Sequence, residues 1–117
     1  MHNFREMKIW QKAREFVKEI YKTTAEFPSD EKFALALQMQ RAAVSIPSNI
    51  AEGAGRNSDK DFNKFLSIAN GSAFELETQI YLAYDLNYID KNKLEKLTVK
   101  IIEIKKMIYG FKKNLKI

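Results

Sequence analysis

Four polar side chains in the segment RAAVSIPSNIAEGAGR, residues 41–56, have the types and the spacing of a helical stripe. Arg41, Ser45, Asn49 and Glu52 follow one another at steps of four, four and three residues, so on a helix they line one face. The residues between them are largely apolar, which places the stripe beside a hydrophobic core, where polar groups without partners are costly. Such a stripe can form a hydrogen-bonded network that specifies packing, or it can hold a ligand.

A second polar stripe follows in the next helical segment. Ser72, Glu75 and Gln79 step by three and four residues, and Gly71 beside them permits a close backbone approach. If the two helices run antiparallel from a turn at residues 53–58, equal distances from that turn place Arg41 near residues 72–75. We therefore predict a bidentate ion pair between Arg41 and Glu75, with Ser45 and Ser72 alongside. We favour a structural or interface role for this network over ligand binding.

Positive charge is concentrated at the end of the chain. Residues 1–90 contain eleven Lys and Arg against thirteen Asp and Glu, whereas residues 91–117 contain nine lysines against two glutamates, a balance of +7. A helix with this charge can attract phosphate groups, acidic protein surfaces or anionic lipid. It can also be an ordinary solvated helix face.

The lysines of the last helix are the candidates for nucleic-acid contact. They flank its apolar positions on both sides and also point outward, which makes a broad positive surface suited to binding phosphates without reading sequence. The candidates are Lys93, Lys96, Lys100, Lys105, Lys106, Lys112 and Lys113, together with Arg56 at the end of the 41–56 segment. Tyr81, Tyr84, Tyr88 and Tyr109 could stack on bases, although we favour subunit contacts for them.

The residue types do not favour an enzyme. The only histidine is His2, close to a terminus that we expect to be mobile, and there is no cysteine to bind a metal or form a disulfide. The carboxylates Glu52, Glu75 and Glu77 lack the Glu-x-x-His motifs of di-iron bundles, and nothing supports a magnesium site. The GAGR at residues 53–56 lacks the rest of a phosphate-binding loop. We expect no catalytic residue, metal or cofactor.

Helical periodicity runs through the whole chain. We predict four helices, at about residues 6–26, 30–53, 59–87 and 91–115. The starts of the last three have capping residues, namely Ser29, Ser58 with Asp61 in a capping box, and Asp90. Gly53 and Gly55 should end the second helix, because glycine tolerates the left-handed conformation found after a helix end.

The spacing of apolar residues in the last two helices averages 3.5 residues, which is typical of helices that pack nearly parallel or antiparallel. Short connections make neighbouring helices antiparallel. The sequence therefore predicts one all-α domain over residues 1–117, an antiparallel up-down-up-down four-helix bundle. No apolar run reaches the roughly 20 residues that span a bilayer. The N-terminus lacks a signal-peptide pattern, so we expect a cytoplasmic protein without a membrane partner.

The segments QMQRAAVSIPSNIAEGAGR and FLSIANGSAFELETQ resemble the four-helix-bundle proteins of the S23 type. These are encoded in intervening sequences of bacterial 23S ribosomal RNA genes and elsewhere in bacterial genomes. The resemblance covers nearly the full chain. Its most specific residues are Arg41, Ser45, Asn49, Ile50, Ala51, Glu52, Gly53, Arg56, Gly71, Ser72 and Glu75.

This family is similar in fold to the accessory variability determinant proteins of diversity-generating retroelements. Those are basic four-helix bundles that assemble as pentameric barrels and bind nucleic acid and a reverse transcriptase. The resemblance implies a ring-like homopentamer here, RNA or DNA as the leading partner, and a reverse transcriptase as a candidate protein partner.

Two main functions stay open at this point, besides a third possibility, an enzyme that would use Glu52 and Glu75 with a divalent metal. The first is a non-enzymatic, self-assembling bundle that binds the backbone of RNA or DNA through its lysines. The alternative is a protein-interaction scaffold or adaptor whose basic last helix contacts an acidic protein partner.

Overall fold

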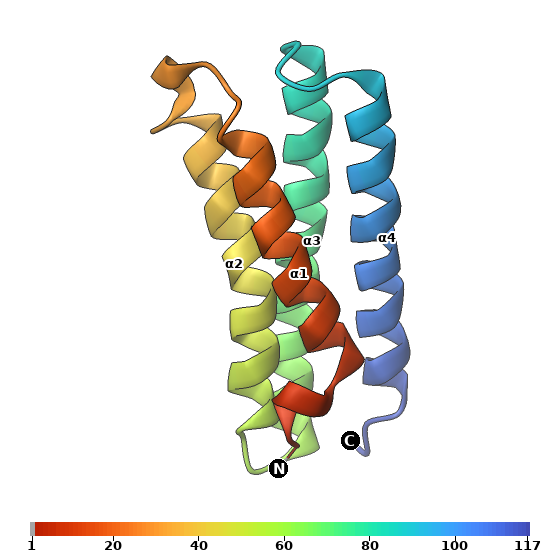
Figure 1. Cartoon of the computed structure of the whole chain (residues 1–117). Helices are drawn as coiled ribbons and strands as arrows, with labels where there is room; N and C mark the ends of the chain where they lie inside the picture. Colours follow the sequence, from red (N-terminus) through yellow and green to blue (C-terminus); the bar gives the residue numbers. More distant parts are fainter. Residues whose placement is uncertain (1) are drawn as a thin grey trace.

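The structure, a computed structural model, describes residues 2–117 and consists of four long helices (Figure 1). They are α1 (Lys8–Thr24), α2 (Leu35–Ala54), α3 (Asp59–Asp85) and α4 (Lys91–Lys113), with short 3-10 turns η1 (Phe4–Glu6) and η2 (Ser29–Glu31) before the first two. Residues 2–117 contain no β-strand. The predicted all-α four-helix bundle is confirmed.

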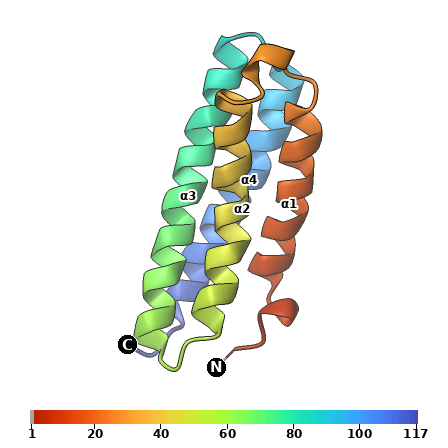
Figure 2. The same ribbon diagram turned by 90° about the vertical axis from the view of Figure 1, so that its left-hand side faces the viewer.

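Consecutive helices run in opposite directions, as the colour gradient in Figures 1 and 2 shows. α2 packs against α1 and α3, α3 packs against α4, and α1 closes the bundle against α4. Both ends of the chain lie at the end of the bundle that carries the α2–α3 turn (Figure 1). The backbone N–H of His2 donates to the Ala54 carbonyl at 3.0 Å, which attaches the N-terminal segment to the end of α2.

The core is made by the apolar positions that recur every three or four residues on each helix. Ile20, Met39, Leu66 and Ile104, one from each helix, are fully or almost fully buried in it. Burying an aliphatic side chain of this size stabilises the fold by about 1.5–3 kcal/mol. All four helices contribute to the same cluster, so the described residues share one hydrophobic core.

Two of the predicted helix starts are formed as the sequence indicates. The Ser58 hydroxyl accepts a hydrogen bond from the Asp61 backbone N–H at 3.1 Å at the start of α3. The Asp90 carboxylate accepts one from the Lys93 N–H at 2.8 Å at the start of α4. Between these helices Asn87 has a φ of 63°, a left-handed conformation that asparagine adopts more readily than most residues.

The start of α2 differs from the prediction, because residues 29–31 form the separate turn η2 and α2 begins at Leu35. Ser29 makes no capping hydrogen bond there. Glu31 instead accepts a hydrogen bond from the Leu35 N–H at 3.2 Å through one carboxylate oxygen. Its other oxygen accepts one from the Tyr88 hydroxyl at 2.5 Å. Glu31 thus links the start of α2 to the α3–α4 connection.

Gly53 does not have the role that the sequence suggested, since no glycine among residues 2–117 is left-handed. It lies inside α2, and a Cβ atom built on it would be 2.7 Å from Cδ1 of Phe62 and 2.8 Å from Cβ of Phe65. Glycine is required at this position because α2 and α3 approach each other closely beside their connecting turn. Among residues 2–117, no helix is long and apolar enough to cross a membrane.

Candidate nucleic-acid interface and polar face of α2 and α3

A small hydroxyl network joins α2 and α3 at their midpoints. The Ser45 and Ser72 hydroxyl oxygens are 2.7 Å apart. The Asn49 side-chain amide donates to the Ser45 carbonyl at 2.8 Å and to the Ser45 hydroxyl at 3.0 Å. The structure therefore places Ser45 and Ser72 side by side, as the antiparallel count from the turn predicted.

The predicted ion pair between Arg41 and Glu75 is absent. Both side chains are exposed, and neither makes a side-chain hydrogen bond or ion pair within the part of the chain that the structure describes. An ion pair between two long, exposed side chains contributes little free energy in water, because hydration of the separate charges is nearly as favourable. The outer part of this face consequently presents a positive and a negative group that have no partner among residues 2–117.

The other members of the predicted network are dispersed. Glu52 pairs with Arg56 at 3.2 Å on the same helix, and the Arg56 guanidinium lies 4.6 Å from the centroid of the Phe65 ring. Gln79 is buried, and its side-chain oxygen has no hydrogen-bond partner among residues 2–117. A Cβ atom at Gly71 would meet nothing within 4 Å, so the close approach predicted there does not occur among residues 2–117.

Three of the candidate lysines on α4 are engaged by neighbouring helices. Lys100 forms an ion pair with Glu19 of α1 at 2.5 Å, and Lys105 forms one with Glu77 of α3. The Lys112 ammonium donates to the Ser67 hydroxyl at 2.7 Å. These contacts place Lys100 on the α1 side of α4 and the other two on the α3 side.

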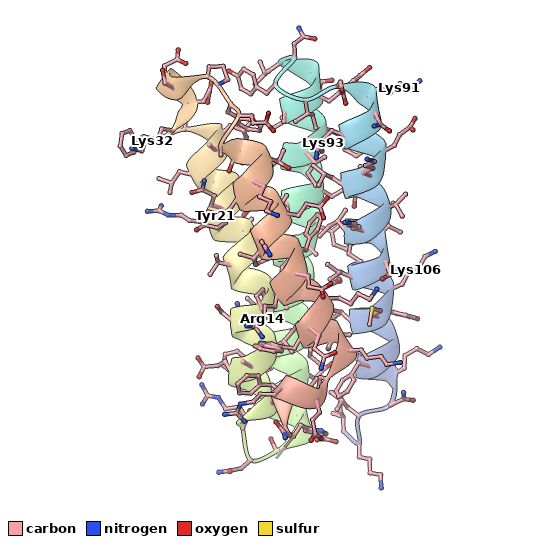
Figure 3. All side chains as sticks on the ribbon, in the orientation of Figure 1. Arg14, Tyr21, Lys32, Lys91, Lys93 and Lys106 are labelled. Carbon is pink, nitrogen blue, oxygen red and sulfur yellow. The ribbon has the colours of Figure 1, made fainter. Side chains whose placement is uncertain are left out.

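The remaining candidates on α4 face solvent or a surface groove. Lys96, Lys106 and Lys113 are exposed and have no carboxylate within 4.0 Å among residues 2–117. Figure 3 shows Lys106 at the edge of α4 that faces away from the rest of the bundle. Lys93 differs, since it lines a groove shared with α1 in which Glu15, Glu19 and Glu26 also lie.

Exposed aromatic rings lie on the same side of the molecule as the α3–α4 contacts. Lys105 Nζ is 4.0 Å from the centroid of Phe74, an exposed ring that the sequence interpretation did not single out. Lys113 Nζ is 5.4 Å from the centroid of Tyr109, which is also exposed. The spacing of Phe74 to Tyr81, two turns of helix, was the available signal for this stripe.

Tyr88 is not available as a surface ring. It is half-buried, with its ring centroid 5.1 Å from that of Phe27. The hydrogen bond from its hydroxyl to Glu31, together with desolvation, raises the pKa of Tyr88 to about 12. Tyr88 therefore fastens the α3–α4 connection to the start of α2.

His2 is docked on the bundle, which differs from the mobile terminus expected from the sequence. Its Nε2 lies 3.3 Å from Oδ1 of Asp59, and its ring packs against Phe62 and Phe111. The hydrogen bond from the Lys116 backbone N–H, followed by the one from His2, lowers the pKa of Asp59 below its ordinary value. Within residues 2–117 no three His, Cys, Asp or Glu side chains cluster as metal ligands.

The fold and this surface define a class of protein: a small four-helix bundle with a hydroxyl network between two helices and a lysine-rich fourth helix. Residues 5–110 match the family described as 23S rRNA-intervening sequence protein, and the chain belongs to that family. The resemblance found in the sequence is confirmed.

A solved structure from Bacteroides thetaiotaomicron VPI-5482, described as a protein with unknown function from the S23 ribosomal protein family, has the same fold. The two chains are 28% identical, with a TM-score of 0.85, and the match covers 91% of this chain and 96% of the other. A comparison with curated proteins finds no match.

Proposed function

We propose that this chain is a non-enzymatic, self-assembling bundle that binds the phosphate backbone of RNA or DNA through α4. The observation that best supports this proposal concerns the nine lysines in residues 91–117. Only two of them have a carboxylate within 4.0 Å among residues 2–117. The other seven ammonium groups, on α4 and its C-terminal extension, thus have no ion pair among the described residues to neutralise their charge. Phosphate groups would provide that neutralisation, with release of counterions as the driving force.

The arrangement favours backbone contacts over recognition of a base sequence. Lys96, Lys106 and Lys113 spread along most of the length of α4 and converge on no pocket. Lysine is a flexible point charge, which suits phosphates spaced along a strand better than the fixed donor pattern of a base edge. A row of exposed lysines of this kind favours binding that does not depend on the base sequence and that weakens as the salt concentration rises.

Self-assembly is the second part of the proposal, and the α2–α3 face supports it. Arg41 and Glu75 are exposed there with opposite charges and without partners among residues 2–117, and the exposed apolar residues Ile68 and Leu82 lie on the same side of α3. Gly71, in the same stretch of α3, leaves open space for a neighbouring backbone. A second copy would place Arg41 against Glu75. The resemblance described above implies five copies, which would multiply the basic surface and its avidity.

Charge reversal on α4 tests the nucleic-acid proposal. Binding of labelled RNA and DNA is followed by fluorescence anisotropy for the Lys106→Glu variant, with Lys32→Glu as the control. Lys32 lies at the opposite edge of the molecule from α4 (Figure 3). We expect Lys106→Glu to weaken binding at least about tenfold at low salt and Lys32→Glu to change it far less. Equal effects of the two variants would show that α4 is not the binding surface.

Light scattering tests assembly. The wild-type protein should have a mass of about 68 kDa if it forms a pentamer, five times the 13.6 kDa of one chain. Arg41→Glu and Glu75→Arg should each lower the mass, because each places like charges across the contact, and the double variant should restore it. A wild-type mass of one chain at working concentration would contradict the assembly proposal.

A further inference from the structure

We propose that the exposed surface over α3 and α4 is a stacking surface for unpaired bases, so that the protein prefers single-stranded nucleic acid to duplex. This inference rests on the proposed function and adds the class of nucleic acid that the basic surface binds. Its basis is the presence of exposed rings and ammonium groups together on the surface over α3 and α4.

Three aromatic rings are exposed on this surface. Tyr109 on α4 is 64% exposed, Phe74 on α3 is 56% exposed and Tyr81 on α3 is 47% exposed. None of them pairs with another aromatic ring among residues 2–117. Leaving apolar rings in water is unfavourable, so a set of them at one site indicates a partner that covers them.

The rings belong to two facing stripes. On α3, Phe74, Glu77 and Tyr81 follow at steps of three and four residues, and on α4 Lys105 and Tyr109 are one turn apart. The ion pair between Lys105 and Glu77 and the contact of Lys105 with the Phe74 ring show that these stripes meet. The hydrogen bond from Lys112 to Ser67 continues the contact toward the other end of α4.

Cations accompany the rings on this surface. Lys105 lies 4.0 Å from the centroid of Phe74, and Lys113 lies 5.4 Å from that of Tyr109. Lys106 is exposed on the next face of α4. Lys105 is already paired with Glu77, whereas Lys106 and Lys113 have no carboxylate within 4.0 Å among residues 2–117. A strand laid along this surface would find rings for its bases and these two ammonium groups for its phosphates, which is the combination that proteins use to hold single strands.

The exposed rings should distinguish single strands from duplexes. In a duplex the bases stack on one another and present only their edges and the backbone, so the three rings would gain nothing from binding it. An unpaired base has a free face, and stacking on an aromatic side chain adds affinity that does not depend on sequence. The lysines contribute to the affinity for both single strands and duplexes, whereas the rings contribute only to the affinity for single strands.

An abasic strand isolates the contribution of the rings. Three probes of equal length are compared by anisotropy at fixed salt: oligothymidine, a strand of abasic sugar phosphates, and a duplex. The abasic strand keeps the phosphate charge and has nothing to stack. We expect the wild-type protein to bind oligothymidine about tenfold or more tightly than the abasic strand. Equal affinity for the two would overturn the stacking inference and leave phosphate binding in place.

Replacing the rings should remove that preference. Tyr109→Leu and Phe74→Leu keep apolar volume at exposed positions, and each should reduce the preference for oligothymidine over the abasic strand while leaving abasic binding unchanged. The matched control is Phe33→Leu, because Phe33 is an 82% exposed ring beside Lys32 on the turn before α2. If Tyr109→Leu and Phe74→Leu reduce the preference no more than Phe33→Leu does, the rings over α3 and α4 are not the stacking surface.

Two further outcomes are distinguishable. If none of the three probes binds at low salt, the proposed function itself fails, together with the inference that rests on it. If Tyr109→Leu lowers the mass in light scattering and the preference for oligothymidine persists, the rings belong to a contact between copies of the chain, and the stacking inference is wrong.

Discussion

The hydroxyl oxygen of Ser45 on α2 lies 2.7 Å from that of Ser72 on α3. This contact sits at the midpoint of both helices, and Asn49 supports it by donating to the Ser45 hydroxyl at 3.0 Å. Farther out on the same face, Arg41 and Glu75 have no partner within residues 2–117. The inner part of this polar face is thus satisfied within one chain, and its outer part is not.

The serine contact should contribute modestly to stability. We expect Ser72→Ala to lower the free energy of unfolding by about 1 kcal/mol, because the half-buried Ser45 hydroxyl loses one of its partners. The double variant with Ser45→Ala should cost less than the sum of the single variants, since the two hydroxyls share one contact. Urea unfolding measures all three values. Strict additivity would show that the two residues act independently.

Gly53 should be intolerant of any side chain. A Cβ atom there would be 2.7 Å from Phe62 and 2.8 Å from Phe65, so α2 and α3 must move apart in Gly53→Ala. We expect a loss of about 1–3 kcal/mol in the free energy of unfolding, the usual cost of overpacking. The control is Gly110→Ala, where a Cβ meets nothing within 4 Å and helix propensity should give up to about 1 kcal/mol of stabilisation. Similar thermal midpoints for both variants would contradict this account.

Tyr88 should make stability sensitive to alkaline pH. Its pKa is raised from 10.0 to about 12 in the folded state, because its hydroxyl donates to the Glu31 carboxylate. The neutral phenol is therefore favoured in the folded protein, and its contribution is fully present below pH 10 and disappears as the pH rises toward 12. Comparing denaturant midpoints of wild-type protein and Tyr88→Phe across this range measures the effect. We expect the difference between them to vanish at the high end, and a constant difference would refute the linkage.

The ion pair between Lys105 and Glu77 should contribute more to the stability of the fold than the exposed ion pair between Lys12 and Glu103. Its side chains are 17% and 18% exposed, against 51% for both partners of the Lys12–Glu103 pair. Removing one partner of a largely buried pair leaves a charge without compensation. Glu77→Gln should lower the free energy of unfolding by about 1–3 kcal/mol, whereas Glu103→Gln should leave it nearly unchanged. Chemical denaturation of both variants tests the ranking.

Much of the fold could be predicted from the sequence, because its signals are local. Apolar residues at helical spacing mark the four helices, and Ser58 and Asp90 cap α3 and α4 through hydrogen bonds to residues three positions later. The start of α2 could not be predicted in this way. It depends on Glu31, whose carboxylate also binds the hydroxyl of Tyr88, 57 residues away. A contact at that distance in sequence leaves no periodic pattern.

The candidate site was predictable only in part, for a similar reason. Counting residues from the α2–α3 turn placed Ser45 and Ser72 in the same neighbourhood, because neighbouring antiparallel helices keep a common register, and the two hydroxyls are in contact. The same count suggested an Arg41–Glu75 pair, but long exposed side chains are positioned by solvation as much as by register. Nor could the sequence show that Lys100 pairs with Glu19, because that contact depends on how α1 closes against α4.

The most direct test of the central claim is the affinity of the wild-type protein for a labelled single strand, measured from about 50 to about 200 mM salt. We predict a straight line of falling log affinity against log salt, with a slope of about −0.7 for each phosphate that α4 neutralises. The slope should become shallower in Lys106→Glu. No binding at the lowest salt, or affinity that does not change with salt, would contradict the account.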